Sequence, residues 1–411
     1  MNKNSVQETK QLWKGNIAIL TLVAAFVGLL CARSVASGAM FLFGVNALWD
    51  VHPKRWLQQR WWLVVVAWVG MYAISFFWTT DTEEWVAHLQ VKLPFLLLPL
   101  AFAFLPKFSK KQTDFFTWSL GLMMFAAAIY GLWPLWHSSE SLIHSYKYAH
   151  VLPTAMFNDH ISFSTAVALS IAWIVYYFPF LERKSSRILM LLLALFLAVY
   201  LHILAAKTGL VAFYVLLLGI AITQVRKSPT KGLLILVLGI IGFTAAYTFI
   251  PTLRERIGYS KVTWLSYKSG ERSGIYSDGG RLMSYKLGLK SIAAHPLLGV
   301  GAGDVLDEMK LRYREDYPEV KEAQMLWPHN VFLTSAMAVG IPGTLFLVFW
   351  IFWPLSKVRR NRVSLYFVLM LAMLLVPLMV DVSFEVQAGV GVFLLFYLWQ
   401  KKALDDASNT A

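Results

Sequence analysis

Apolar blocks of close to 20 residues recur along the whole length of this 411-residue chain. A helix needs about 20 predominantly apolar residues to cross the hydrocarbon core of a bilayer. Within lipid the backbone polar groups must be satisfied internally, which leaves helices or closed barrels. Because 58% of the residues are hydrophobic and only 15% are charged, we predict an all-α polytopic membrane protein.

The spacing of the blocks predicts about twelve transmembrane helices. Their expected ranges are 13–31, 34–51, 61–79, 87–105, 114–136, 159–181, 188–204, 207–225, 232–250, 330–354, 363–381 and 385–400. We therefore expect three parts: nine helices in residues 1–250, one long helical loop in residues 251–329, and three helices with a C-terminal tail in residues 330–411. Loops of such length carry function more often than short connections do.

The formal net charge of +14 does not indicate nucleic acid binding, because most Lys and Arg residues fall in short loops between apolar blocks. Every second loop is basic, and the positive-inside rule places basic loops in the cytoplasm. Both termini are then cytoplasmic and the long loop lies on the other side. The basic loops are 52–60, 106–113, 182–187, 226–231 and 356–362.

Two further classes of feature are excluded by the sequence. A single cysteine, Cys31, excludes an internal disulfide framework. The first apolar block leads directly into the second and lacks a small-residue cleavage site, so no cleavable signal peptide is expected.

A helix is predicted in the long loop, beginning near Gly280 and capped by Ser277 or Asp278. Helical spacing places four apolar or aromatic residues on one face. These residues are Leu282, Tyr285, Leu289 and Ile292.

Arg281 lies in the first turn of this predicted helix, next to Gly279 and Gly280. A helix N-terminus with accessible amides and a guanidinium is a plausible binding site for a diphosphate. The alternative is an amphipathic helix lying on the membrane, with Lys286 and Lys290 as its solvated basic edge.

The segment GVGAGD, residues 299–304, contains three glycines but lacks the preceding strand that a dinucleotide-binding loop requires. Pro296 ends the helix before it. We therefore interpret Gly299, Gly301 and Gly303 as a turn joining two helices, and His295 as a residue at a turn or helix end.

Lys207 and His329 occupy the predicted outer ends of apolar blocks. Lys207 is either a cation that extends to the membrane surface or a ligand for an anion, because a helix N-terminus is a poor place for an isolated cation. His329 is either an interfacial hydrogen-bonding residue or a proton acceptor, since imidazole titrates near neutral pH. Trp327 would anchor the segment at the interface.

No HExxH, Walker A, CxxC or GxSxG motif and no clear DxD pair is present. The candidate site is therefore predicted to be cationic, without a metal ion or cofactor, which suits an anionic leaving group.

The segments GGRLMSYKLGLKSIAAHPLLGVGAGD and PHNVFLTSAMAVGIPG, in this order, resemble the O-antigen ligase / O-antigen polymerase superfamily of bacterial envelope glycosyltransferases. The resemblance covers the whole architecture of about twelve spans with one long late loop. It implies a fold similar to the metal-independent GT-C class. It also implies transfer of a glycan from undecaprenyl diphosphate to a sugar hydroxyl of lipid A–core, with inversion, at the periplasmic face of the bacterial inner membrane.

By this resemblance Arg281 would bind the donor diphosphate, and His329 would act as base for the acceptor hydroxyl or orient it. The family usually has an Arg where this chain has Lys207, which keeps the charge but loses the bidentate geometry. Supporting cations are expected from the long loop. They are Arg254, Arg256 and Arg272.

Several alternatives remain open from the sequence. An O-antigen or exopolysaccharide polymerase would use another lipid-linked glycan as acceptor, and a protein O-oligosaccharyltransferase would use a protein. A transporter or flippase also fits twelve spans, although the polar residues of interest concentrate in one loop rather than in mid-span positions. A structural or assembly protein would tolerate changes at His329.

Overall fold

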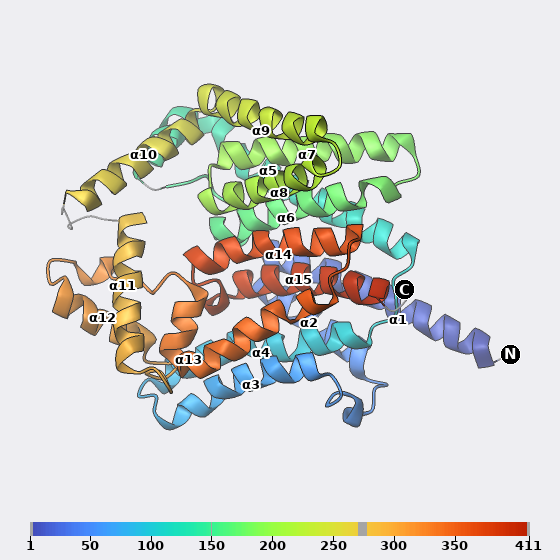
Figure 1. Ribbon diagram of the computed structural model, residues 1–411, viewed down its shortest axis with the longest axis horizontal. Helices are drawn as coiled ribbons and strands as arrows, with labels where there is room; N and C mark the ends of the chain where they lie inside the picture. Colours follow the sequence, from blue (N-terminus) through green and yellow to red (C-terminus); the bar gives the residue numbers. More distant parts are fainter. Residues whose placement is uncertain (1–2, 149, 270–277, 409–411) are drawn as a thin grey trace.

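A computed structural model describes residues 3–148, 150–269 and 278–408, and all of its regular secondary structure in these ranges is helical. Figure 1 shows a bundle of long helices, with α10, α11 and α12 grouped beyond one end of it, at the left of the view. The α-helices are α1 Lys3–Cys31, α2 Arg33–Leu48, α3 Arg60–Ile74, α4 Thr82–Phe104, α5 Lys110–Ser145, α6 His160–Tyr177, α7 Lys184–Leu204, α8 Lys207–Val225, α9 Pro229–Phe249, α10 Pro251–Lys268, α11 Asp278–Ala294, α12 Val305–Asp316, α13 Val331–Phe352, α14 Arg362–Val380 and α15 Gln387–Ser408.

The prediction of a polytopic α-helical membrane protein is confirmed. Within the described ranges, ten helices are long and apolar enough to cross a membrane: α1, α3 to α9, α13 and α14. The other two predicted spans are also helices, α2 and α15, but they do not meet those criteria. The first has only 16 residues, and the last turns of the second carry four charged residues, Lys401, Lys402, Asp405 and Asp406.

Polar side chains set where several helices begin. Asp81, Asp159 and Asn361 each accept a hydrogen bond from a backbone N–H in the first turn of α4, α6 and α14. Ser109 and Gln112 form a reciprocal capping box at the start of α5. These caps satisfy N–H groups that the first helical turn leaves without partners.

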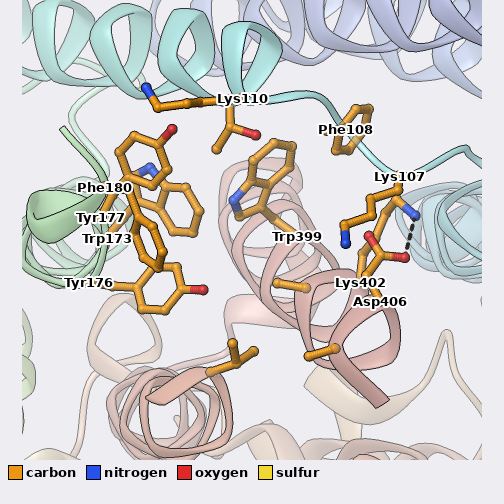
Figure 2. Close-up of a pocket in the computed structure, with 14 residues that line it drawn as sticks. Lys107, Phe108, Lys110, Trp173, Tyr176, Tyr177, Phe180, Trp399, Lys402 and Asp406 are labelled. Atoms are coloured by element: carbon orange, nitrogen blue, oxygen red, sulfur yellow. Dashed lines mark hydrogen bonds and ion pairs between the residues drawn. The ribbon is translucent and has the colours of Figure 1, made fainter. Parts of the chain in front are cut away.

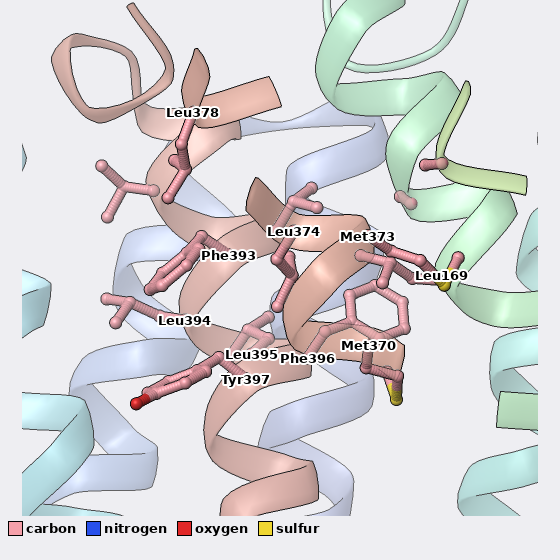
Figure 3. Close-up of a cluster of buried hydrophobic side chains, with 14 of the residues drawn as sticks. Leu169, Met370, Met373, Leu374, Leu378, Phe393, Leu394, Leu395, Phe396 and Tyr397 are labelled. Atoms are coloured by element: carbon pink, nitrogen blue, oxygen red, sulfur yellow. The ribbon is translucent and has the colours of Figure 1, made fainter. Parts of the chain in front are cut away.

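The core of the bundle is formed by α6, α14 and α15, whose apolar side chains interdigitate (Figure 3). Leu169, Met373 and Phe393 are buried in this cluster. In the apolar stretch of α6, 83% of the residues are buried inside the protein, whereas only 6% are buried in α9. Helix α6 is therefore a central element, and α9 presents nearly all of its apolar surface outward.

Helix α13 is interrupted at Val339 and Gly340, where the backbone leaves helical geometry. The connection between α11 and α12 fills this break. Val300 donates its N–H to the carbonyl of Met337 over 2.7 Å, and Ile341 donates to the carbonyl of Pro296 over 2.9 Å. Backbone groups released by the break are thereby satisfied, as they must be at membrane depth.

The glycines of GVGAGD serve this packing. Gly301 has φ +107°, and a side chain there would collide with Thr79. Asp304 follows and accepts hydrogen bonds from the backbone N–H groups of Thr80 and Asp81. The interpretation of this segment as a connection between two helices is confirmed, and it also anchors the start of α4.

The two ends of the bundle differ in their residues. The starts of α4, α6, α8, α13 and the end of α14 lie at the end covered by α11, which we call the α11 end. At the opposite end of the bundle, beyond the C-terminus of α4, lies a pocket of about 490 Å³. It is lined by aromatic rings and by Lys107, Lys110 and Lys402 (Figure 2). This basic end corresponds to the loops that the charge pattern assigns to the cytoplasm.

Topology gives the first testable prediction. Single cysteines introduced in a Cys31→Ala background at residues 57, 185 or 359, all in basic loops, should be labelled only from the cytoplasm. Cysteines at residues 254 and 314, in α10 and α12, should react with a membrane-impermeant reagent from outside. The reason is that Lys and Arg flanking short loops resist translocation. Labelling of residues 254 and 314 from the cytoplasmic side would contradict this orientation.

Candidate functional site at the α11 end

His329 immediately precedes α13, and its neighbour Asn330 caps that helix by accepting hydrogen bonds from the N–H groups of Phe332 and Leu333. The imidazole Nδ1 lies 3.6 Å from Oδ1 of Asp381, and 21% of the side chain is exposed. His329 has φ +40°, in the left-handed region that non-glycine residues adopt rarely. Such backbone geometry persists only where surrounding contacts hold it.

Those contacts come from α11 and α14. The hydroxyl of Tyr285, on α11, lies 3.1 Å from the carbonyl oxygen of His329 and 2.8 Å from that of Met379. The side-chain amide of Asn330 donates to the same Met379 carbonyl over 3.2 Å. The segment carrying His329 is therefore tied to the end of α14, and this places the imidazole beside Asp381.

Asp381 was not predicted as a site residue. It directly follows α14, is only 8% exposed, and accepts a hydrogen bond from the Ser383 hydroxyl. Burial alone would raise the pKa of Asp381, but the interaction with His329 and hydrogen bonds from Val382 and Ser383 hold that pKa below its usual value. An ionised carboxylate beside Nδ1 favours a proton on that nitrogen and leaves Nε2 able to accept one.

A signal for Asp381 is present in the sequence, because it is a lone carboxylate at the end of an apolar run. An ionisable residue at such a position is a functional candidate by default. What the sequence does not show is that its partner lies 52 positions earlier in the chain.

Arg281 lies in the first turn of α11, as predicted, and is half-buried. Its charge acts on the imidazole of His160, as do the charges of Arg256 and Asp381. His160 is the first residue of α6. Four elements, α6, α10, α11 and the end of α14, thus bring ionisable groups together at the α11 end.

Asp159, which caps α6, belongs to the same region. Burial raises the pKa of Asp159, and the negative charge of Asp381 raises it further, while hydrogen bonds from Ser162 oppose this. Asp159, at the start of α6, and Asp381, at the end of α14, therefore belong to one region of the α11 end.

The three arginines predicted as supporting cations differ in where they lie. Arg256 is half-buried on α10, with its guanidinium 5.6 Å from the ring centre of Tyr259, and its charge reaches both Tyr146 and His160. Arg254 lies on an exposed side of the same helix. Arg272 and the predicted cap Ser277 lie outside the described residues, as does the side chain of Asp278.

Lys207 is the first residue of α8 and is half-buried. The preceding residues are held in place by two hydrogen bonds: Thr252 of α10 donates to Ile203 over 2.6 Å, and Tyr146 donates to Leu204 over 3.0 Å. Because Thr252 is about one helical turn from Arg256, Lys207 and Arg256 lie at the same end of the bundle.

The apolar face predicted for α11 does not coincide with the residues that this helix buries. Ile292 is buried, but Leu289 is 56% exposed, and the buried residues of the helix also include Met283, Leu287 and Gly288. The reason is tertiary packing: α11 rests on α13, and Gly288 lies against Pro328 and Met337. The side of α11 that is buried is the side that meets α13.

The basic edge of α11 is not merely solvated. Lys286 donates to the hydroxyl of Tyr267 on α10 over 3.0 Å, and Lys290 pairs with Asp316 on α12 over 2.7 Å. These two lysines connect the three helices of the long loop. His295 follows the end of α11 and is exposed, in agreement with its interpretation as a helix-end residue.

No group of three or more His, Cys, Asp or Glu side chains in the described ranges is arranged to hold a metal ion. Positive groups at the α11 end include Arg256, Arg281 and Lys207, and proton-accepting groups there include His329, Asp381 and Asp159. Such a set can bind a diphosphate and accept a proton from a hydroxyl.

Residues 192–348 match the sequence model of a family described as O-antigen ligase. The chain carries an O-antigen ligase family domain. This domain extends from α7 into α13 and contains Lys207, Arg256, Arg281 and His329, whereas Asp381 and His160 lie outside it. The family resemblance inferred from two short segments is thereby confirmed, and the family is one of membrane enzymes of the O-antigen ligase or polymerase kind. No curated protein shows a significant match to the chain.

Proposed function

We propose that this protein is an O-antigen ligase of the bacterial inner membrane. It transfers a glycan from undecaprenyl diphosphate to a sugar hydroxyl of lipid A–core on the periplasmic side, with inversion and without a metal ion. The observation that carries the proposal is the pairing of His329 with Asp381 at the end of the bundle where Arg281 lies.

In the proposed reaction the Nε2 atom of His329 takes the proton of the acceptor hydroxyl while its oxygen attacks the anomeric carbon of the donor glycan. The bond between that carbon and the diphosphate oxygen breaks, and its electron pair leaves with undecaprenyl diphosphate. Arg281, Arg256 and Lys207 stabilise the negative charge that develops on the leaving group. Asp381 stabilises the imidazolium that forms on His329.

An apolar groove supports a donor with a prenyl chain. It has a volume of about 580 Å³, lies between α7, α8 and α9, and is lined almost entirely by apolar side chains such as Val199, Leu238 and Phe249. One end of the groove reaches Ile250, directly before α10 and its Arg256. A prenyl chain in this groove would leave its diphosphate near the cations.

Gene deletion followed by electrophoresis of the lipopolysaccharide tests the proposal. Loss of the ligase should give core without polymer, together with undecaprenyl-linked long chains, and plasmid-borne wild type should reverse both. Core carrying a single repeat would instead indicate a polymerase. Unchanged lipopolysaccharide with loss of glycan from proteins would indicate a protein O-oligosaccharyltransferase. Accumulation of the donor on the cytoplasmic side would indicate a flippase.

Lys207 gives a further prediction. Lys207→Arg should retain transfer, because the guanidinium keeps the charge and adds two-point contact with a phosphate. Lys207→Ala should reduce transfer on the order of 10²-fold, as for loss of one group that stabilises a developing anion. The measurement is transfer of lipid-linked glycan in membranes with matched protein levels. Full activity of Lys207→Ala would make Lys207 an interfacial anchor instead.

A further inference from the structure

A second cluster of ionisable side chains is buried between α4 and the short 3-10 helix η7, Ser383–Glu385. Oε2 of Glu385 lies 2.7 Å from the ammonium of Lys92 and 2.7 Å from Nδ1 of His88. Lys92 is fully buried, and the other two side chains are each 9% exposed. We call His88, Lys92 and Glu385 the α4 triad.

The charges of the α4 triad compensate one another. Burial alone would raise the pKa of Glu385, but the charge of Lys92 and the hydrogen bond from His88 lower it to about 2. The Lys92 ammonium also lies 4.3 Å from the ring centre of Tyr72, over its face. The carboxylate therefore stays ionised across the physiological pH range, and its two partners have fixed positions around one oxygen.

Buried ion pairs add little stability compared with apolar side chains of similar volume, because both charges lose their hydration. What they can add is a definite geometry, since each bond is short and directional. The role of the α4 triad therefore depends on which segments it holds in fixed relative positions.

The α4 triad contacts both segments that carry the His329–Asp381 pair. Glu385 lies four residues after Asp381, and between them Ser383 donates its hydroxyl to Asp381. On the other side, the ring of His88 packs edge-on against Trp327, with 5.2 Å between ring centres, and Trp327 is two residues before His329.

Helix α4 is itself anchored at this end. Its first turn follows Thr80 and Asp81, whose N–H groups bind Asp304 from the start of α12. In the first turn of the helix, a carboxylate oxygen of Glu84 lies 3.5 Å from Nε2 of His88. The α4 triad therefore connects an anchored helix, α4, to the segment that carries His329 and to the segment that carries Asp381.

We infer that the α4 triad is a positioning device that sets the separation of His329 and Asp381, so that loss of its geometry lowers turnover rather than folding. His88, Lys92 and Glu385 are positioning residues in this account, since they act through the pair and not on the substrate. The effect on turnover rests on the proposed function, whereas the effect on the separation of the two residues does not.

The principal variant is Lys92→Met combined with Glu385→Leu, which removes both charges and leaves neither one unpaired. It should insert normally. Its kcat should fall on the order of 10²-fold, the loss expected when a reacting group is displaced by about 1 Å, with little change in KM for the donor. The matched control is Lys402→Met with Asp406→Leu, a pair 3.2 Å apart at the opposite end of the bundle, which should keep the wild-type kcat (Figure 2).

A second readout needs no activity. In a Cys31→Ala background, cysteines replace His329 and Asp381, and a short bifunctional thiol reagent measures how readily they are joined. Cross-linking should be fast when the α4 triad is intact, at least tenfold slower in the double variant, and unchanged in the control pair. If the double variant fails to insert, His88→Leu takes its place. This variant keeps Lys92 and Glu385 paired and should also slow cross-linking.

The outcomes separate the two proposals. Wild-type kcat together with unchanged cross-linking in the triad variants would overturn the positioning role. If cross-linking is impaired in the variants but the wild type transfers no glycan to lipid A–core, the positioning role is supported. The proposed function alone is then overturned. Loss of folding in every triad variant, but not in the control pair, would make the triad a stability element and overturn the inference.

Discussion

Arg281→Ala is expected to abolish glycan transfer while leaving the protein inserted in the membrane. Arg281 lies in the first turn of α11, and its charge reaches the ionisable cluster at the start of α6. A leaving diphosphate gains negative charge as its bond to the glycan breaks, and a fixed cation at that point stabilises the transition state more than the ground state. Loss of this group should lower kcat by at least about 10²–10³-fold.

The conservative variant sharpens this test. Arg281→Lys should recover little activity, because a planar two-point donor is replaced by a point charge. Arg314→Ala is the matched control, since Arg314 is an exposed arginine of α12 in the same loop. Transfer should be measured with purified donor and acceptor at matched protein levels. Equal rates for Arg281→Ala and Arg314→Ala would remove Arg281 from the donor site.

His329→Ala should reduce transfer by about 10²–10⁴-fold, the range typical for loss of a general base, and by more if His329 also orients the acceptor. The protein should remain folded, because the side chain is partly exposed at the edge of the bundle and contributes little to its packing. Asp381→Asn should also lower transfer, since the amide cannot stabilise the imidazolium.

Because the two residues act as a unit, the double variant His329→Ala with Asp381→Asn should be no slower than His329→Ala alone. His295→Ala, at the exposed end of α11, is the control and should keep near-wild-type activity. An additive loss in the double variant would show that Asp381 acts independently of His329.

The pH dependence of the wild type follows from the same pair. Activity should fall as the pH falls, because only a neutral imidazole can accept the proton of the acceptor hydroxyl. The pKa of Asp381 lies below its usual value, so protonation of this carboxylate does not account for a loss of activity in the mildly acidic range. The acid loss of activity should be absent from the residual activity of His329→Ala. EDTA should not inhibit the wild type, and complete inhibition would contradict the metal-independent reaction.

The length and apolarity of the blocks, and the charges of the loops between them, are local properties, so the helical membrane architecture could be predicted from the sequence. The same holds for the helix that carries Arg281 and for the position of His329 at the start of an apolar helix. Family resemblance in two segments added the O-antigen ligase or polymerase family, which the family domain over residues 192–348 confirms. The catalytic roles of these residues stay predictions.

Contacts between distant segments could not be predicted in this way. Helical periodicity placed Leu289 on an apolar face of α11, but Leu289 is exposed, and the packing of α11 on α13 decided which residues of the helix are buried. Nothing local distinguishes Arg256 from Arg254, although only the former is partly buried toward His160.

The pairing of Asp381 with His329, and of Glu385 with Lys92, joins residues that are 52 and 293 positions apart. A sequence pattern records which residues can be buried along one helix, whereas the partner of a buried charge depends on which helices pack together and at what depth. For that physical reason the sequence alone determined the helices and the candidate cation and base of this protein. Only the tertiary structure decided the carboxylate beside the base and the buried triad that holds both segments.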